Sequence, residues 1–243
     1  MDFAIQICSY VVGLPLELLA ISAILRSGLR RYPLVFAYVL VVFLTTVVEM
    51  PTALAYYHGQ PSRAVHETMV AHYWRNEGIL QVTIFAAVIS LIYSASSKLE
   101  SRRLVRFALV TGFMLVVGIS YLINYDPNVR PGVWMTPWTR DLKFCSAILD
   151  LALWALLIRA KEKNRILLAV SGGLGIMFAG GAIGEALRNL STASQLHGLS
   201  TAGGLLVIGA DMMLLYILWQ VFRKGPAAGG IGKPPSIQER AAR

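Results

Sequence analysis

The sequence has little charge and few cysteines for its length. Only 14% of its 243 residues are charged whereas 56% are hydrophobic, and the mean hydropathy is +0.60. This composition excludes an ordinary soluble domain, because one soluble core cannot bury so much apolar surface. Cys8 and Cys145 lie among apolar residues and are interpreted as free thiols. The chain also lacks GxSxG, nucleotide-loop, haem and paired metal-ligand motifs, so no motif indicates a reaction.

Seven apolar runs are long enough to cross a bilayer, whose core of about 30 Å is spanned by roughly 20 helical residues. The runs are continuous, without the alternation of barrel strands, so they predict helices. We predict an all-α polytopic membrane protein whose single domain, residues 1–224, is a bundle of seven transmembrane helices. The predicted helices cover approximately residues 3–25, 33–56, 78–95, 107–123, 142–158, 166–187 and 199–222.

The basic residues divide unequally between the two ends of these helices. Eleven lysines and arginines follow the first, third and fifth helices, six lie at the opposite end, and five more follow the seventh. Because cytoplasmic loops are enriched in Lys and Arg, we predict that the N-terminus is outside and the C-terminus inside. The formal charge of +9 then indicates a basic face on an anionic inner leaflet, not nucleic-acid binding. Residues 225–243, rich in Gly and Pro, are predicted to form a disordered cytoplasmic tail.

Acidic side chains within the predicted spans are the most informative feature, because an isolated charge in lipid is costly and must be paired, protonated or hydrated. Glu49, Glu77 and Glu185 are predicted to lie in the outer third of the bundle, at the same depth as several basic residues. Asp150 and Asp211 are predicted to lie deeper, and Glu17 deepest. We predict a polar cluster between the second, third, fifth and sixth helices, open to the outside; a structural ion-pair network is the alternative. The predicted ligand-binding residues are Glu49, Glu77, Glu185, Arg75, Lys143, Arg188, Asp150 and Asp211.

The predicted outer side also carries histidines and tryptophans. Trp74, Trp134 and Trp138 are interpreted as an interfacial aromatic belt, with a lid over a site as the alternative. The histidines match neither HExxH nor a standard zinc spacing, so we predict no metal and no cofactor. They are His58, His66, His72 and His197.

Glycines are concentrated in the sixth predicted helix, where Gly180 and Gly184 form a GxxxG motif. Small residues allow close approach of helix backbones. We interpret this face as packing within the bundle; dimerisation or binding of another membrane protein through it is the alternative.

Two short stretches resemble a group of bacterial proteins. Arg31-Tyr32-Pro33 through Tyr38, followed by Tyr73-Trp74-Arg75-Asn76-Glu77, resembles small uncharacterised bacterial seven-helix proteins, chiefly over the first three helices. The resemblance implies a bacterial inner (cytoplasmic) membrane and supplies no activity, cofactor or site. A retinal protein is excluded, since 199–222 contains no lysine for a Schiff base.

We therefore predict a noncatalytic module that binds a small molecule or ion in an outward-facing polar cavity, as a sensor or transport component. One alternative is a membrane-embedded metal-dependent hydrolase, with a carboxylate and His66, His72 or His197 as metal ligands. The other is a structural subunit of a membrane complex. The predicted partners are the lipid bilayer, a small-molecule or ion ligand, and a membrane protein or second copy bound through the sixth helix.

Overall fold

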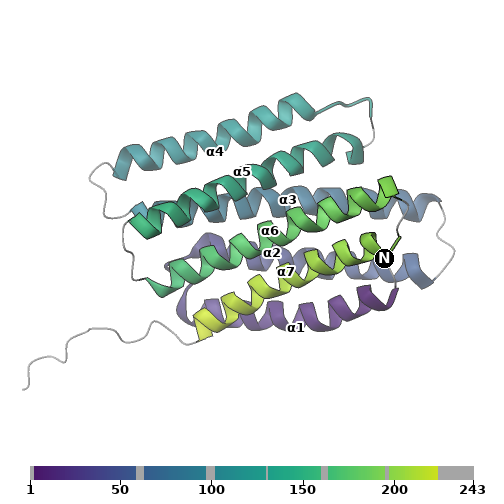
Figure 1. Ribbon diagram of the computed structural model, residues 1–243, viewed down its shortest axis with the longest axis horizontal. Helices are drawn as coiled ribbons and strands as arrows, with labels where there is room; N and C mark the ends of the chain where they lie inside the picture. Colours follow the sequence, from purple (N-terminus) through teal and green to yellow (C-terminus); the bar gives the residue numbers. More distant parts are fainter. Residues whose placement is uncertain are drawn as a thin grey trace, which may run out of the picture.

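The computed structural model describes residues 3–58, 63–96, 102–129, 131–159, 164–194 and 197–223, and these residues form seven helices, so the all-α prediction is confirmed. The helices lie side by side in one bundle (Figure 1). The predicted tail, 225–243, lies outside the described residues. The elements are α1 (Phe3–Ser27), α2 (Pro33–His58), α3 (Arg63–Ala95), α4 (Arg102–Asn124), α5 (Pro131–Arg159), α6 (Arg165–Ser194) and α7 (His197–Arg223).

Two helices begin well before their predicted starts. The prediction began α3 at 78 and α5 at 142, whereas the helices begin at Arg63 and Pro131. The apolar run marks only the part of a helix suited to lipid, whereas backbone hydrogen bonding continues through polar residues beyond it. Pro131 is suited to the first helical position because its missing N–H would have no partner within the helix.

Six of the described helices are long and apolar enough to cross a membrane, which indicates a multi-pass membrane protein. The exception is α5, although it is 29 residues long and lies alongside the others in Figure 1. Its sequence contains Arg140, Asp141, Lys143 and Asp150, which lower its apolar content. The seventh span therefore stays a prediction, as does the direction in which the chain crosses.

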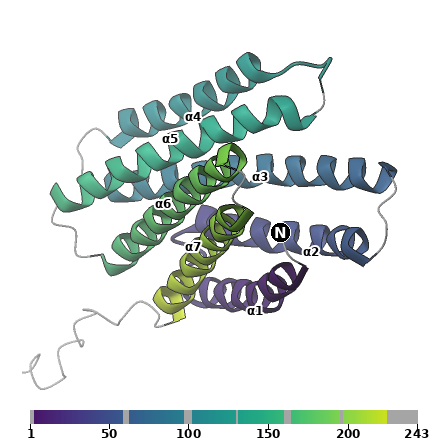
Figure 2. The ribbon, with the colours of Figure 1, turned by 45° about the vertical axis from the view of Figure 1, so that its right-hand side comes forward.

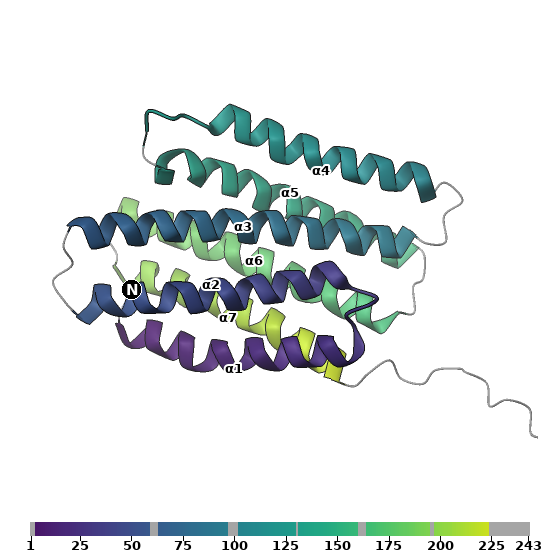
Figure 3. The same cartoon turned by 180° about the vertical axis from the view of Figure 1, so that it is seen from behind.

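Six helices form a closed ring and α4 lies outside it. Around the ring, α1 packs on α2, α2 on α3, α3 on α5, α5 on α6, α6 on α7, and α7 back on α1. The remaining helix, α4, packs on α3 and α5 and forms the edge of the bundle in every view (Figures 2 and 3). The described residues thus form one ring with a peripheral helix.

The most extensive helix pair is α6 with α7, and glycines bring the two backbones together. A Cβ atom added at Gly184 would lie 2.7 Å from the carbonyl oxygen of Gly203 and 2.5 Å from Val207 Cγ2. At Gly180 an added Cβ would clash with Ala210. The GxxxG face of α6 is therefore filled within the chain, as the packing interpretation expects, and a homo-oligomer would need another surface.

One end of the ring is closed by a continuous apolar core. Tyr32 and Phe222 are both 1% exposed and pack edge to face with ring centroids 5.8 Å apart. The hydroxyl of Ser27 donates to the carbonyl oxygen of Phe222 over 2.6 Å, and Asn164 donates to the Tyr32 hydroxyl over 3.2 Å. These contacts join α1, α2 and α7 to the start of α6, so the interior is sealed at this end.

Candidate functional site

A cavity of about 520 Å³ occupies the ring beyond this core, toward the N-terminal end of α1. All six ring helices contribute to its wall and α4 contributes none. The wall combines apolar and aromatic residues, as small-molecule sites do, with more polar residues than such sites usually have. Its polar and charged residues are Ser9, Tyr10, Glu17, Tyr38, Thr45, Thr46, Glu49, Tyr73, Glu77, Gln81, Arg140, Lys143, Glu185, Arg188 and Asp211.

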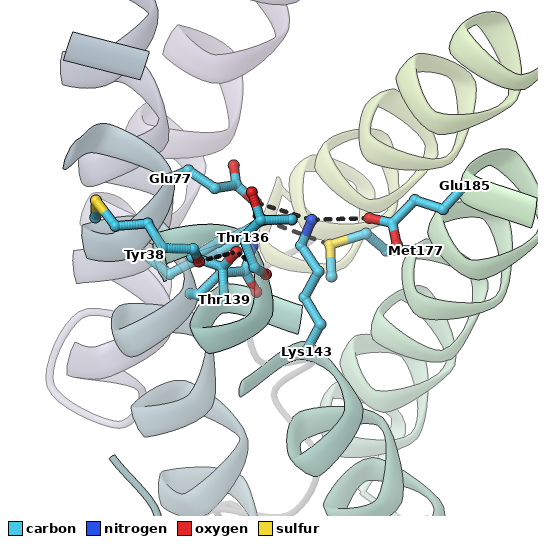
Figure 4. Close-up of polar contacts among 9 residues, drawn as sticks. Tyr38, Glu77, Thr136, Thr139, Lys143, Met177 and Glu185 are labelled. Atoms are coloured by element: carbon cyan, nitrogen blue, oxygen red, sulfur yellow. Dashed lines mark hydrogen bonds and ion pairs between the residues drawn. The ribbon is translucent and has the colours of Figure 1, made fainter. Parts of the chain in front are cut away.

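Lys143 joins three helices across this cavity. Its Nζ atom lies 2.8 Å from Glu77 Oε1 and 3.1 Å from Glu185 Oε1, so a lysine from α5 bridges carboxylates of α3 and α6. Figure 4 shows the ammonium group between the two carboxylates. Gln81, one turn after Glu77, donates to the same Glu77 oxygen over 3.1 Å. One cation thereby pairs with two of the carboxylates.

The other three carboxylates of the cavity make no ion pair among the described residues. Glu49 Oε1 accepts a hydrogen bond from Asn76 Nδ2 over 2.9 Å. Glu17, only 4% exposed, accepts one at Oε1 from the Thr46 hydroxyl over 3.0 Å. Asp211 is exposed to the cavity and has no hydrogen-bond partner within the described part of the chain. These three groups are available to a cation.

Two buried acceptor atoms in the wall have no donor. Among the described residues, four buried side-chain nitrogen or oxygen atoms lack a hydrogen-bond partner. Two of them, Glu17 Oε2 and Gln81 Oε1, belong to residues that line the cavity. Buried polar atoms are ordinarily satisfied, so unpaired acceptors at a cavity indicate a place for a donor. The other two atoms belong to His72 and Trp138, which do not line the cavity.

The structure brings six of the eight sequence-predicted ligand-binding residues to the cavity and places two elsewhere. Arg75 is exposed and does not line the cavity, and the hydrogen-bond donor to Glu49 is its sequence neighbour Asn76. Asp150 is 1% exposed and accepts a hydrogen bond from Ser171 over 2.8 Å, so it belongs to the α5–α6 contact. Arg75 and Asp150 were predicted from their depth in the bundle. Whether a side chain faces the cavity depends on the rotation of its helix, which depth does not give.

Sequence reasoning gave no role to Tyr38, although its side chain lies within the cavity. Its hydroxyl is 3.5 Å from Met177 Sδ of α6 (Figure 4). The available signal was spacing, because Tyr38, Val42, Thr45 and Glu49 share one face of α2 at intervals of three and four residues. The cavity wall also includes Glu17 of α1 and Asp211 of α7, which the prediction placed deeper than the cluster between the other four helices.

The outer tryptophans lie away from the cavity, and most of the histidine side chains lie outside the described set. None of the three tryptophans lines the cavity, and Trp134 and Trp138 instead pack against Tyr121 of α4 with centroids 5.5 and 5.7 Å away. Within the described residues no three His, Cys, Asp or Glu side chains are grouped to hold a metal ion. The side chains of His58, His66 and His197 lie outside the described set.

Comparisons with known proteins identify no relative from which a role could be carried over. No protein-family model, no curated protein and no solved structure matches the chain.

Proposed function

We propose that this multi-pass membrane protein binds a small molecule or ion in the ring cavity, as a sensor or transport component without catalytic activity. The observation that carries the proposal is a 520 Å³ cavity lined by five carboxylates, three of which make no ion pair among the described residues. Interhelical hydrogen bonds in membranes average only about 0.6 kcal/mol, so stability is a weak reason to retain such costly groups. Binding of a ligand is a stronger reason to retain these carboxylates.

We further propose that α5 crosses the membrane as a seventh span. Within its apolar stretch, Lys143 lines the cavity and Asp150 is buried, whereas Asp141 accepts hydrogen bonds from two side chains of α4. Between residues 144 and 158 the exposed side chains of α5 are all apolar, Leu151 and Ile158 among them. Charges that face the interior of a bundle are compatible with a lipid-facing helix. With seven spans, the excess of Lys and Arg after α1, α3 and α5 favours an outside N-terminus and a cavity open to the outside.

Reporter fusions test whether α5 crosses the membrane and in which direction the chain is oriented. We expect alkaline phosphatase fused after Asp126, between α4 and α5, to be active, because that enzyme matures only outside the cytoplasm. A fusion after Asn164, between α5 and α6, is expected to be inactive as phosphatase and fluorescent as green fluorescent protein. The same cytoplasmic result is expected after Arg223. Identical results at Asp126 and Asn164 would show that α5 does not cross.

The proposed location is a bacterial inner membrane. The resemblance of Arg31-Tyr32-Pro33 and Tyr73-Trp74-Arg75-Asn76-Glu77 to bacterial seven-helix proteins supports it, as does the basic face expected on an anionic leaflet.

Ligand binding is tested with a variant that fills the cavity. Gly181 lines the cavity and has no atom within 4 Å of an added Cβ, so Gly181→Phe places a ring in the cavity without a clash at its base. The measurement is thermal unfolding of nanodisc-embedded protein with a panel of small amines, carboxylic acids, sugars and alkali-metal chlorides. We expect at least one class to raise the Tm of the unmodified protein and to lose this effect in Gly181→Phe.

The matched control is Gly209→Phe, which introduces the same ring on α7 at an exposed position that does not line the cavity. This variant is expected to keep the full Tm shift. If no class in the panel stabilises the unmodified protein, or if Gly181→Phe retains the shift, binding in this cavity is refuted.

A further inference from the structure

We propose that the ligand of the cavity is an organic ammonium compound, a step that rests on the proposed function and specifies its ligand class. The first support is charge. The cavity wall within the described residues holds five carboxylates, listed above, but only three basic groups, Arg140, Lys143 and Arg188. A cavity with surplus carboxylates in a wall of low dielectric attracts cations and repels anions.

The second support is the hydrogen-bonding capacity that the wall leaves unused. Glu17 is only 4% exposed, and its Oε2 atom accepts no hydrogen bond. Gln81 Oε1 is a second buried acceptor without one. Both unsatisfied atoms of the cavity wall are therefore acceptors, and an ammonium group carries only donors. An ammonium group thus matches both the charge of the wall and the missing hydrogen bond of Glu17.

The third support concerns size and distinguishes an organic cation from a metal ion. A water molecule occupies about 30 Å³ in the liquid, so a cavity of about 520 Å³ is many times larger than one small ion. Within the described residues no three His, Cys, Asp or Glu side chains approach closely enough to coordinate a metal. The carboxylates are instead spread around a wall that includes Tyr10, Tyr38 and Phe178. Aromatic faces and dispersed carboxylates together suit an ammonium ion with an apolar body.

The arrangement also indicates where the ammonium group binds. Lys143 already occupies the space between Glu77 and Glu185, so the ligand's cation belongs with Glu17 and Asp211, away from that bridge. Both carboxylates line the cavity together with Tyr38. The ammonium group is therefore placed at Glu17 and Asp211, with the apolar body extending along the rest of the wall.

The test uses three probes of nearly equal size and different charge: 2-phenylethylammonium, neutral 2-phenylethanol and anionic phenylacetate. Binding to nanodisc-embedded protein is measured from the Tm shift across a concentration series. We expect the ammonium probe to bind most tightly. Glu17→Gln and Asp211→Asn are each expected to weaken it on the order of tenfold or more, because a charged hydrogen-bond partner is lost.

The control variant is Asp150→Asn, which removes a buried membrane carboxylate that does not line the cavity, and it is expected to leave the affinity unchanged. Asp211→Asn gives a result even if Glu17→Gln does not fold, because Asp211 makes no hydrogen bond among the described residues. Equal or tighter binding of phenylethanol or phenylacetate overturns the inference but leaves cavity binding standing. If the ammonium probe does not bind while another class in the panel does, the ammonium inference is likewise overturned and cavity binding still stands. If no probe and no panel class binds, both proposals are wrong.

Discussion

Gly184→Leu is expected to lower the free energy of unfolding by about 1–3 kcal/mol, the usual effect of overpacking a close contact. A Cβ at this position would lie 2.7 Å from the backbone oxygen of Gly203, and backbone cannot rotate away as a side chain can. Relief would require α6 and α7, the most extensive helix pair, to separate along their contact. The measurement is unfolding of the purified protein in mixed micelles with increasing dodecyl sulfate, followed by tryptophan fluorescence.

The matched control is Gly181→Leu, three residues earlier on the same helix. Both variants gain the same helix propensity, up to about 1 kcal/mol for replacing glycine. An added Cβ at Gly181 has no atom within 4 Å, so this variant is expected to be at least as stable as the unmodified protein. Equal losses in the two variants would mean that the α6–α7 backbones do not approach as closely as described.

Lys143→Met is expected to destabilise the bundle by about 1–3 kcal/mol, less than for a fully buried ion pair because the lysine is partly exposed. Its side chain is 38% exposed and its partner Glu77 is 15% exposed. The substitution leaves Glu77 and Glu185 facing each other without the ammonium that bridges them. The same dodecyl sulfate titration measures the loss.

Two further variants separate charge pairing from a general effect of losing a cation. Arg140→Met removes an exposed basic residue of the same cavity that makes no ion pair among the described residues, so it is expected to change stability by less than about 0.5 kcal/mol. Adding Glu77→Gln and Glu185→Gln to Lys143→Met is expected to restore most of the lost stability, because neither carboxylate of the bridge is then left without its cation. A triple variant no more stable than Lys143→Met would contradict the bridge.

The candidate site was only partly predictable, and the errors share one origin. Counting residues inward from the ends of each helix placed Glu49, Glu77 and Glu185 at one depth with Lys143, and all four line the cavity. It also grouped Arg75 with them, which the structure turns away from the cavity. The depth of a residue can be counted along one helix. The direction in which its side chain points depends on how that helix is rotated against its neighbours.

The sequence by itself determined that the chain is helical, that it contains apolar runs long enough for a membrane, and that acidic groups lie within them. These properties can be predicted locally because each helix satisfies its own backbone hydrogen bonds and meets lipid through its own side chains. Only the tertiary structure decided that α4 lies outside the ring, and that Lys143 bridges Glu77 and Glu185. Partners such as Tyr38 and Met177, 139 residues apart, meet through the packing of whole helices, which no local pattern records.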